Sequence, residues 1–218
     1  VYLFQGDLHQ KQDIIYIAFS SALSGTYQAA VMARNQVLGE KEEITIDIID
    51  TKCASLGFGL VVYQAAKMAR EGRSREEILA AVDFYSKHME HIFTVDDLEY
   101  LYRGGRVTRT TAFVGGLLNI KPILQVEEGR LVPLEKKKGR KRVLKRMVEI
   151  MKERGEGFAS QTIGISHGDD LETALELKEM IQEELGAEDF LINTIGATIG
   201  AHAGPGTIAL FFLNKLPD

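Results

Sequence analysis

A cluster of hydroxyl side chains around one glycine follows directly after an apolar run near the start of the chain. These residues are Ser20, Ser21, Ser24, Thr26 and Gly25. The β-branched and aromatic run at 14–19 predicts a buried strand of a parallel sheet, and the pattern at 26–33 favours a helix. Such a strand-to-helix turn directs hydroxyls and backbone N–H groups to one point, where the helix N-terminus favours an anion. Ordinary capping of that helix by Ser or Thr stays the alternative.

Two arginines flank a glycine pair in the segment 97–106. The sequence predicts a short helix that stops at Gly104 and Gly105. Arg103 and Arg106 then lie near a chain reversal, where their rigid guanidinium groups suit a carboxylate or a phosphate. The alternative is that both arginines only offset the dipole of the helix C-terminus.

One histidine, His202, lies among small residues in the segment 195–207. Small residues let the backbone approach a ligand closely, and an imidazole can donate hydrogen bonds to an anion. A lone histidine in a loop is often structural, so that interpretation stays open beside the functional one. The sequence therefore offers hydroxyls, arginines and a glycine-flanked histidine, but no nucleophile–base pair. This combination predicts a site that binds an anion. The apolar stretch 110–118 is a candidate wall for a narrow slot beside such a site.

Other chemistries find less support in the sequence. His167 and Asp169 offer only two good metal ligands, so we expect no metal site. No G-x-S-x-G elbow surrounds Ser24, no Walker-type lysine follows Gly25, and no base adjoins Cys53. A hydrolase or phosphotransferase that uses Ser24 or Cys53 as nucleophile stays the alternative from another class.

Composition indicates an ordinary soluble globular protein. The chain has 218 residues, of which 45% are hydrophobic and 26% charged, long enough for one large or two small domains. Its single cysteine cannot form an internal disulfide, and no secretory signal is visible, so we expect a cytoplasmic location. No window approaches a membrane span. We expect no stable membrane insertion and leave transient contact with a membrane surface open.

The net charge of −5 is unevenly distributed, because eight cations fall within the eleven positions 136–146. Such a run is most often a solvated face, although it can also meet phosphate or an acidic partner. We expect no nucleic-acid partner, because no aromatic stacking residues are interleaved with these cations.

The elements that position these residues change in character along the chain. Strands and helices alternate in the first part, and a hairpin with its turn at 128–129 follows in the second. We therefore predict a two-domain α/β fold: a parallel N-terminal domain (1–91), apparently truncated, and a C-terminal domain (92–218) with a mixed or antiparallel sheet. The predicted strands are 14–19, 44–50, 123–134 (as the hairpin), 162–166, 190–195 and 208–213. The predicted helices are 26–38, 58–70, 74–89 with a capping box, 140–154 and 171–185.

Five segments occur in the order in which they are found in the DegV family, a family of bacterial fatty-acid-binding proteins. They are SSALSGTY at 20–27, DT…SLGFG at 50–59, DLEYLYRGGR at 97–106, NIKPIL at 119–124 and HAGPG at 202–206. The chain therefore resembles this family over nearly its whole length.

The resemblance implies two α/β domains with a long-chain fatty acid between them and no enzymatic activity or cofactor of its own. The carboxylate would be held by Ser24, Gly25 and His202. The acyl tail would occupy a tunnel in the C-terminal domain, with candidate lining residues Phe113, Val114, Leu117, Leu118 and Ile195. Family members present the bound acid to a fatty acid kinase, which phosphorylates the carboxylate. Arg103, Arg106 and Arg140 are then candidates for contacting that kinase or the transferred phosphate.

The family pattern also places strand–helix units and a Thr-Ser-Gln-Pro segment before the serine-rich turn, whereas the sequence given begins just before that turn. We therefore expect a partial N-terminal domain, short of strands, and a head-group site that lacks one hydroxyl ligand.

Overall fold

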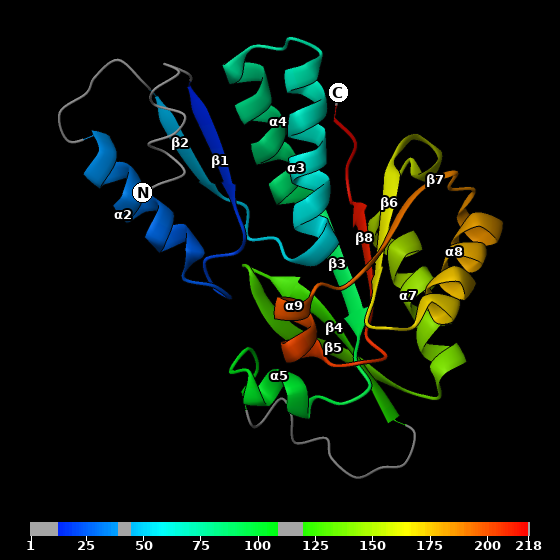
Figure 1. Cartoon of the computed structure of the whole chain (residues 1–218). Helices are drawn as coiled ribbons and strands as arrows, with labels where there is room; N and C mark the ends of the chain where they lie inside the picture. The colour runs from blue at the N-terminus through cyan, green and yellow to red at the C-terminus, as the bar shows by residue number, and fades with distance from the viewer. Residues whose placement is uncertain (1–12, 39–44, 109–119, 218) are drawn as a thin grey trace.

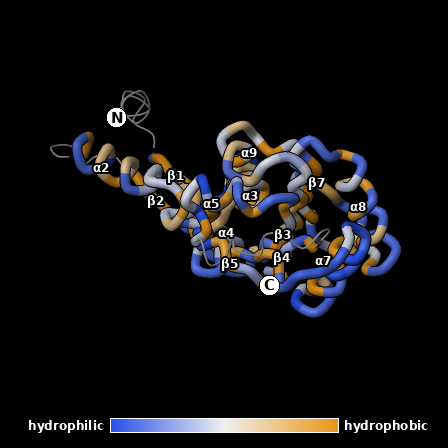
Figure 2. Tube along the Cα trace, turned by 90° about the horizontal axis from the view of Figure 1, so that it is seen from below, coloured by the Kyte–Doolittle hydropathy of each residue, from blue (hydrophilic) through white to orange (hydrophobic). Residues whose placement is uncertain are grey.

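The computed structural model describes residues 13–38, 45–108 and 120–217. Within these residues, β1 (Ile14–Ala18) and β2 (Ile46–Asp50) pair in parallel and are connected through α2 (Thr26–Leu38). Ala30 and Ile46 form the buried centre between this helix and the two strands. These three elements, here called the arm, extend from the rest of the molecule (Figures 1 and 2). Parallel pairing around a connecting helix confirms the parallel character predicted for the first part of the chain.

A six-stranded sheet forms the centre of the main body. Its order is β5-β4-β3-β8-β6-β7, in which β6 and β7 are parallel and the other neighbours antiparallel. The strands are β3 (Met89–Thr94), β4 (Ile120–Glu127), β5 (Arg130–Lys138), β6 (Thr162–His167), β7 (Asp189–Thr194) and β8 (Ile208–Leu213). This mixed sheet confirms the predicted α/β fold class.

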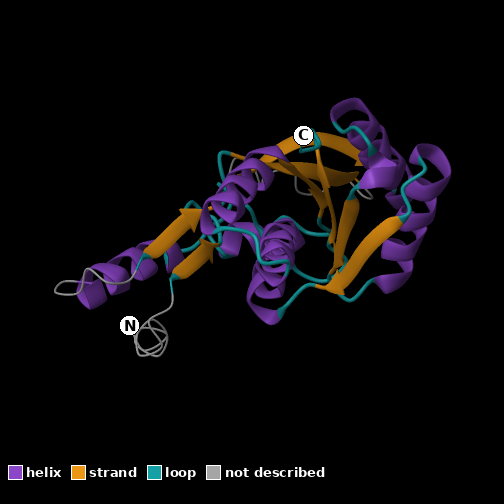
Figure 3. Cartoon of the chain, turned by 90° about the horizontal axis from the view of Figure 1, so that it is seen from above, coloured by secondary structure: helices purple, strands orange, loops and turns teal. Residues whose placement is uncertain are grey.

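Helices cover both faces of the six-stranded sheet (Figures 1 and 3). On one face lie α7 (Arg140–Arg154) and α8 (Leu171–Leu185). On the other face α3 (Ser55–Arg70) contacts β3, β6 and β8, and α4 (Arg75–His88) packs on α3. Every residue of β8 is buried, because its alternating side chains enter the two cores on opposite faces.

Most predicted elements match the structure closely. Helix α7 has its predicted bounds, and its predicted apolar face is buried. The capping box that begins α4 is present, because the Ser74 hydroxyl accepts from the Glu77 N–H and the Glu77 carboxylate accepts from the Ser74 N–H. The hairpin turns at Glu128 and Gly129 as predicted.

Three elements differ from the prediction. Helix α3 begins at Ser55 rather than near residue 58. The helix predicted to run to residue 89 ends at His88, and strand β3 follows it without a loop. The segment predicted as a glycine-rich loop around His202 contains a short helix, α9 (Ala197–Ala203). The structure also contains α5 (Glu99–Arg103), as expected before the glycine pair, and the single turn η1 (Phe158–Ser160).

The domain boundary near residue 92 stays a prediction. Helices α3 and α4 precede this boundary, yet α3 packs against strands of the six-stranded sheet that follow it. Among the described helices, none combines the length and apolar character that a membrane span requires.

Candidate ligand-binding site

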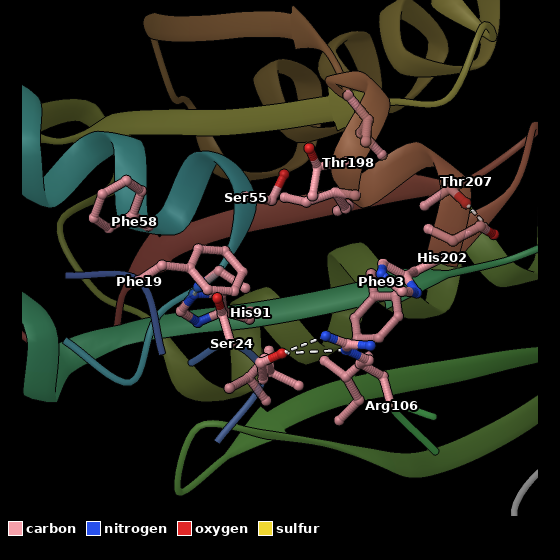
Figure 4. A pocket seen from close by; sticks show the side chains of 18 of the residues that line it. Phe19, Ser24, Ser55, Phe58, His91, Phe93, Arg106, Thr198, His202 and Thr207 are labelled. Atoms are coloured by element: carbon pink, nitrogen blue, oxygen red, sulfur yellow. Dashed lines mark hydrogen bonds between the residues drawn. The ribbon is translucent and has the colours of Figure 1, made fainter. Parts of the chain in front are cut away.

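A cavity of about 420 Å³ lies where the β1–α2 loop of the arm meets the six-stranded sheet. Its wall is mostly apolar and includes the four rings of Phe19, Phe58, Phe93 and Phe211. Its polar lining includes Ser24, Thr26, Ser55, Arg106, Thr198 and His202, several of which appear in Figure 4. Ligand pockets in proteins are about 300–1,000 Å³ and mostly apolar, with a few placed polar groups. This cavity therefore has the size and lining of a site for an amphipathic small molecule.

Ser24 presents its hydroxyl to the cavity from the turn that begins α2. Its Oγ lies 2.7 Å from the Thr26 Oγ1 and accepts a 3.3 Å hydrogen bond from the Thr26 N–H. Ser24 thus satisfies the N–H of the first residue of α2, in a local turn before the helix, while it also lines the cavity. Gly25, between these two lining residues, is exposed.

The hydroxyls of Ser20 and Ser21, in the same turn, make structural hydrogen bonds. The buried Ser20 Oγ donates to the Gly129 carbonyl at 2.8 Å and so ties the arm to the β4–β5 hairpin. The Ser21 hydroxyl and backbone N–H both donate to the Asp50 carboxylate, which also pairs with Lys52 at 2.6 Å. Partial burial raises the pKa of Asp50, but the hydrogen bonds from Lys52 and Ser21 outweigh it and leave that pKa below its ordinary value.

The Gly-Gly-Arg turn brings Arg106 to the cavity wall. Helix α5 ends at Arg103, with Gly104 as its C-cap, and Gly105 adopts a φ of +70°, which glycine tolerates best. The chain then reverses, and the Arg106 guanidinium donates to the Leu23 carbonyl from Nε at 3.1 Å and from Nη2 at 2.9 Å. Its Nη1 donates to the Gly104 carbonyl. Arg106 thus connects the body directly to the residue before Ser24.

His202 lies on α9 and lines the same cavity (Figure 4). Its Nδ1 is buried and has no hydrogen-bond partner within the part of the chain that the structure describes. The ring packs against Gly104, since a Cβ built there would lie 2.0 Å from Nδ1. The missing side chain of Gly104 therefore leaves room for the imidazole. The structure brings Ser24, Arg106 and His202, which come from three separate motifs, to one cavity.

A second cavity histidine, His91 on β3, was missed by the sequence analysis. Its Nδ1 lies 2.9 Å from the Met89 carbonyl, and its Nε2 accepts the Ala54 N–H at 3.2 Å. Burial lowers its pKa to about 4, against a smaller opposing effect of the hydrogen bond to Met89. His91 is therefore a neutral side chain whose two ring nitrogens are both used within the fold. The apolar strand around it gave no pattern that marked it.

Comparisons with known proteins identify the family. Residues 2–215 match the family model described as "Uncharacterised protein, DegV family". The chain belongs to the DegV family. It is 45% identical to a DegV domain-containing protein of Clostridium perfringens over 216 residues, which are 99% of this chain and 74% of that protein.

Solved DegV structures share the fold of this family member. A fatty-acid-binding DegV family protein from Thermus thermophilus is 31% identical, with a TM-score of 0.85 over 96% of this chain and 74% of that one. A DegV family protein from Eubacterium eligens, loaded with heptadecanoic acid, is 25% identical, with a TM-score of 0.86 over 94% of this chain and 74% of that one. These likenesses confirm the resemblance inferred from the ordered motifs.

The other two candidate arginines of this DegV protein lie in ion pairs. Arg103 is exposed on α5 and donates to the Glu99 carboxylate at 2.9 Å. Arg140 begins α7 and bridges Asp96, at 2.7 Å, and Asp170. The role predicted for both in contacting a kinase or phosphate stays a prediction.

The predicted tail-lining residues fall in two groups. Ile195 lines the cavity, two residues before the start of α9. Phe113, Val114, Leu117 and Leu118 lie outside the described residues. Thr198, on the first turn of α9, was not singled out from the sequence, although it belongs to the same glycine-rich segment as His202.

The described residues give no support to the nucleophile alternative. Cys53 is buried, and burial raises its thiol pKa to about 12, which opposes formation of a thiolate. The hydroxyl of Ser24 contacts Thr26 rather than a base. His167 accepts the Asp170 N–H at Nδ1, and no group of metal-ligating side chains gathers in the described ranges.

Proposed function

We propose that this DegV family member binds one long-chain fatty acid, shields its acyl chain and presents its carboxylate to a fatty acid kinase. The cavity carries this proposal, because it combines aromatic walls with a polar group of hydroxyls, a guanidinium and an imidazole. The DegV proteins of T. thermophilus and E. eligens, described as fatty-acid-binding and as loaded with heptadecanoic acid, support the same ligand class.

The carboxylate is proposed to lie at Ser24, Gly25 and His202. Ser24 and His202 both line the cavity, and the buried Nδ1 of His202 lacks a partner in the described structure. A hydrogen bond to a charged group contributes about 1.5–3 kcal/mol, and these donors supply that where the anion must leave bulk water. The head-group contacts therefore orient the acid.

The acyl tail is proposed to supply most of the affinity. Each methylene moved from water into an apolar site contributes about 0.8 kcal/mol, so a long chain gains far more than its head group. Phe19, Phe93 and Phe211 offer such a site beside the polar groups, and Ile195 extends it.

The protein is proposed to act as a cytoplasmic carrier rather than as an enzyme. The kinase partner follows from the family resemblance. Arg103 is exposed and lies at the turn that also supplies Arg106, so it is a candidate contact for a partner that must reach the carboxylate. In the basic run, Lys136, Lys138, Lys141, Arg142 and Lys145 are exposed, which leaves them accessible to an acidic partner surface.

Mass spectrometry of the denatured protein, purified without added lipid, tests the proposal. We expect a long-chain fatty acid at close to one molecule per chain. Ser24→Ala and His202→Ala are expected to retain less of it, with Arg103→Gln as the control that retains a full complement. Absence of any fatty acid, together with failure of delipidated protein to take one up, would contradict the proposed function.

A further inference from the structure

Arg106 differs from the other two candidate arginines, Arg103 and Arg140, in lacking an acidic partner among the described residues. Arg103 pairs with Glu99, and Arg140 pairs with Asp96 and Asp170. Among the described residues, no carboxylate lies within ion-pair distance of Arg106, whose acceptors are two backbone carbonyls. It is nevertheless partly buried at the wall of a largely apolar cavity. A positive charge in such a place is costly unless an anion accompanies it.

The guanidinium also has donors left over. It carries five N–H groups in a fixed planar arrangement. The Nε–H and one N–H of Nη2 bind the Leu23 carbonyl, and one N–H of Nη1 binds the Gly104 carbonyl. One N–H therefore remains on each Nη nitrogen. Such charged N–H donors bind carboxylate oxygens strongly.

The fixed bonds of Arg106 place these donors among the proposed head-group residues. The Leu23 carbonyl that it binds directly precedes Ser24, and the Gly104 against which His202 packs provides the other carbonyl. Figure 4 shows Arg106 and His202 near each other beside Phe93, with Ser24 across the same cavity. The guanidinium is thus bound to the residue before Ser24 and to the glycine against which His202 packs.

We propose that Arg106 is the counter-ion of the bound carboxylate, in addition to holding the Leu23 carbonyl. This inference rests on the proposed function, since it assigns a further ligand to the same fatty acid. It changes the role expected from the sequence, in which Arg106 contacts the kinase or the phosphate. Arg106 would then be a positively charged ligand of the carboxylate, beside the hydroxyl of Ser24 and the imidazole of His202.

The test compares an anionic with a neutral ligand of equal chain length. Delipidated wild-type protein and an Arg106→Gln variant are equilibrated with radiolabelled hexadecanoic acid or hexadecan-1-ol at neutral pH. Glutamine keeps an N–H donor for the Leu23 carbonyl but removes the charge. We expect the wild type to prefer the acid, and the variant to lose roughly 10- to 100-fold of that preference. The binding of the alcohol is expected to change little.

Two further variants separate charge from structure. Arg106→Lys keeps the charge without the planar fork and is expected to keep part of the preference. Arg103→Gln removes an exposed charge from the same turn and is expected to keep all of it. Circular dichroism establishes that each variant is folded.

The possible results separate the two proposals. If the wild type prefers the acid and Arg106→Gln keeps that preference, the counter-ion role is wrong and the proposed function stands. If Arg106→Gln weakens acid and alcohol equally, Arg106 acts only as a structural link, which also overturns the inference. If the wild type binds neither ligand, the proposed function itself fails.

Discussion

Replacement of Gly104 by alanine probes the placement of His202 without touching the histidine. A Cβ at residue 104 would lie 2.0 Å from the His202 Nδ1 and 3.0 Å from its Cγ and Cε1. Gly104 has a φ of −71°, which any residue adopts, so an alanine there brings no backbone strain of its own. The effect of Gly104→Ala therefore comes from its contact with the imidazole.

The size of this effect follows from the geometry. The ring must retreat by about 1.4 Å, the difference between 2.0 Å and the 3.4 Å at which ordinary contact begins. Hydrogen bonds between nitrogen and oxygen span only about 2.7–3.2 Å, so such a shift removes the imidazole from a carboxylate that it binds. Loss of one hydrogen bond to a charged group corresponds to about 1.5–3 kcal/mol, or roughly a 10- to 150-fold weaker affinity.

Binding of labelled hexadecanoic acid to delipidated protein measures this affinity. The neighbouring Gly105→Ala is the matched control, because a Cβ there meets nothing within 4 Å, although its φ of +70° strains an alanine. We expect Gly105→Ala to lower stability while leaving the affinity close to that of the wild type. A folded Gly104→Ala protein with wild-type affinity would refute the assignment of His202 to the head group.

Three further predictions concern the fold and the alternative chemistry. Cys53 is expected to resist iodoacetamide at pH 8 in the native state and to react on unfolding, because its pKa is raised to about 12; rapid native labelling would contradict this. The folded-state pKa of His91, about 4, lies below the ordinary 6.5, so the stability contributed by this neutral imidazole is complete above pH 6.5 and is lost as the pH falls towards 4. In urea unfolding, the free energy of unfolding should fall by up to about 1.4 kcal/mol per pH unit over this range. The unfolding free energy of His91→Gln should depend less steeply on pH. Equal slopes for the wild type and the variant would be inconsistent with a buried neutral ring. Arg140→Gln is expected to cost about 1 kcal/mol of unfolding free energy, since Arg140 links Asp96 and Asp170 while partly exposed. If that variant instead keeps its stability and loses only acyl phosphate formation by the kinase, Arg140 serves the partner.

Much of the fold could be predicted from local patterns. Helices α2, α7 and α8 have their predicted bounds, because strong apolar periodicity runs between clear ends. Strand β8 was equally clear, as a continuous apolar run between glycine-rich and polar segments. These elements carry their own signals in the sequence.

The missed elements lacked such signals. Strand β3 follows α4 directly, with no glycine or proline between them, and its Glu90 and His91 interrupt the apolar run. Pairing with β4 and β8 on both sides stabilises it, which local sequence does not reveal. Helix α9 is bordered or interrupted by Gly196, Gly200 and Gly204, which weaken helix propensity, and contact with α5 supports it.

Some residues of the candidate site could likewise be predicted from the sequence, and others could not. Ser24 and His202 could be found because each lies in a distinctive short motif, and both line the cavity. The position of Arg106 could not be predicted, since its acceptor is the Leu23 carbonyl, more than eighty positions earlier in the chain. Phe19, His91 and Phe211 are ordinary strand or strand-end residues in the sequence, and only the meeting of the arm with the sheet makes them walls of one cavity.

A crystal structure of delipidated protein reloaded with hexadecanoic acid would locate the bound ligand. We expect the carboxylate within hydrogen-bond distance of the Ser24 hydroxyl and near His202 and Arg106, and the tail between Phe19, Phe93 and Phe211. Electron density for the acid outside this cavity, or for a tail whose carboxylate points away from these three polar residues, would contradict this expectation.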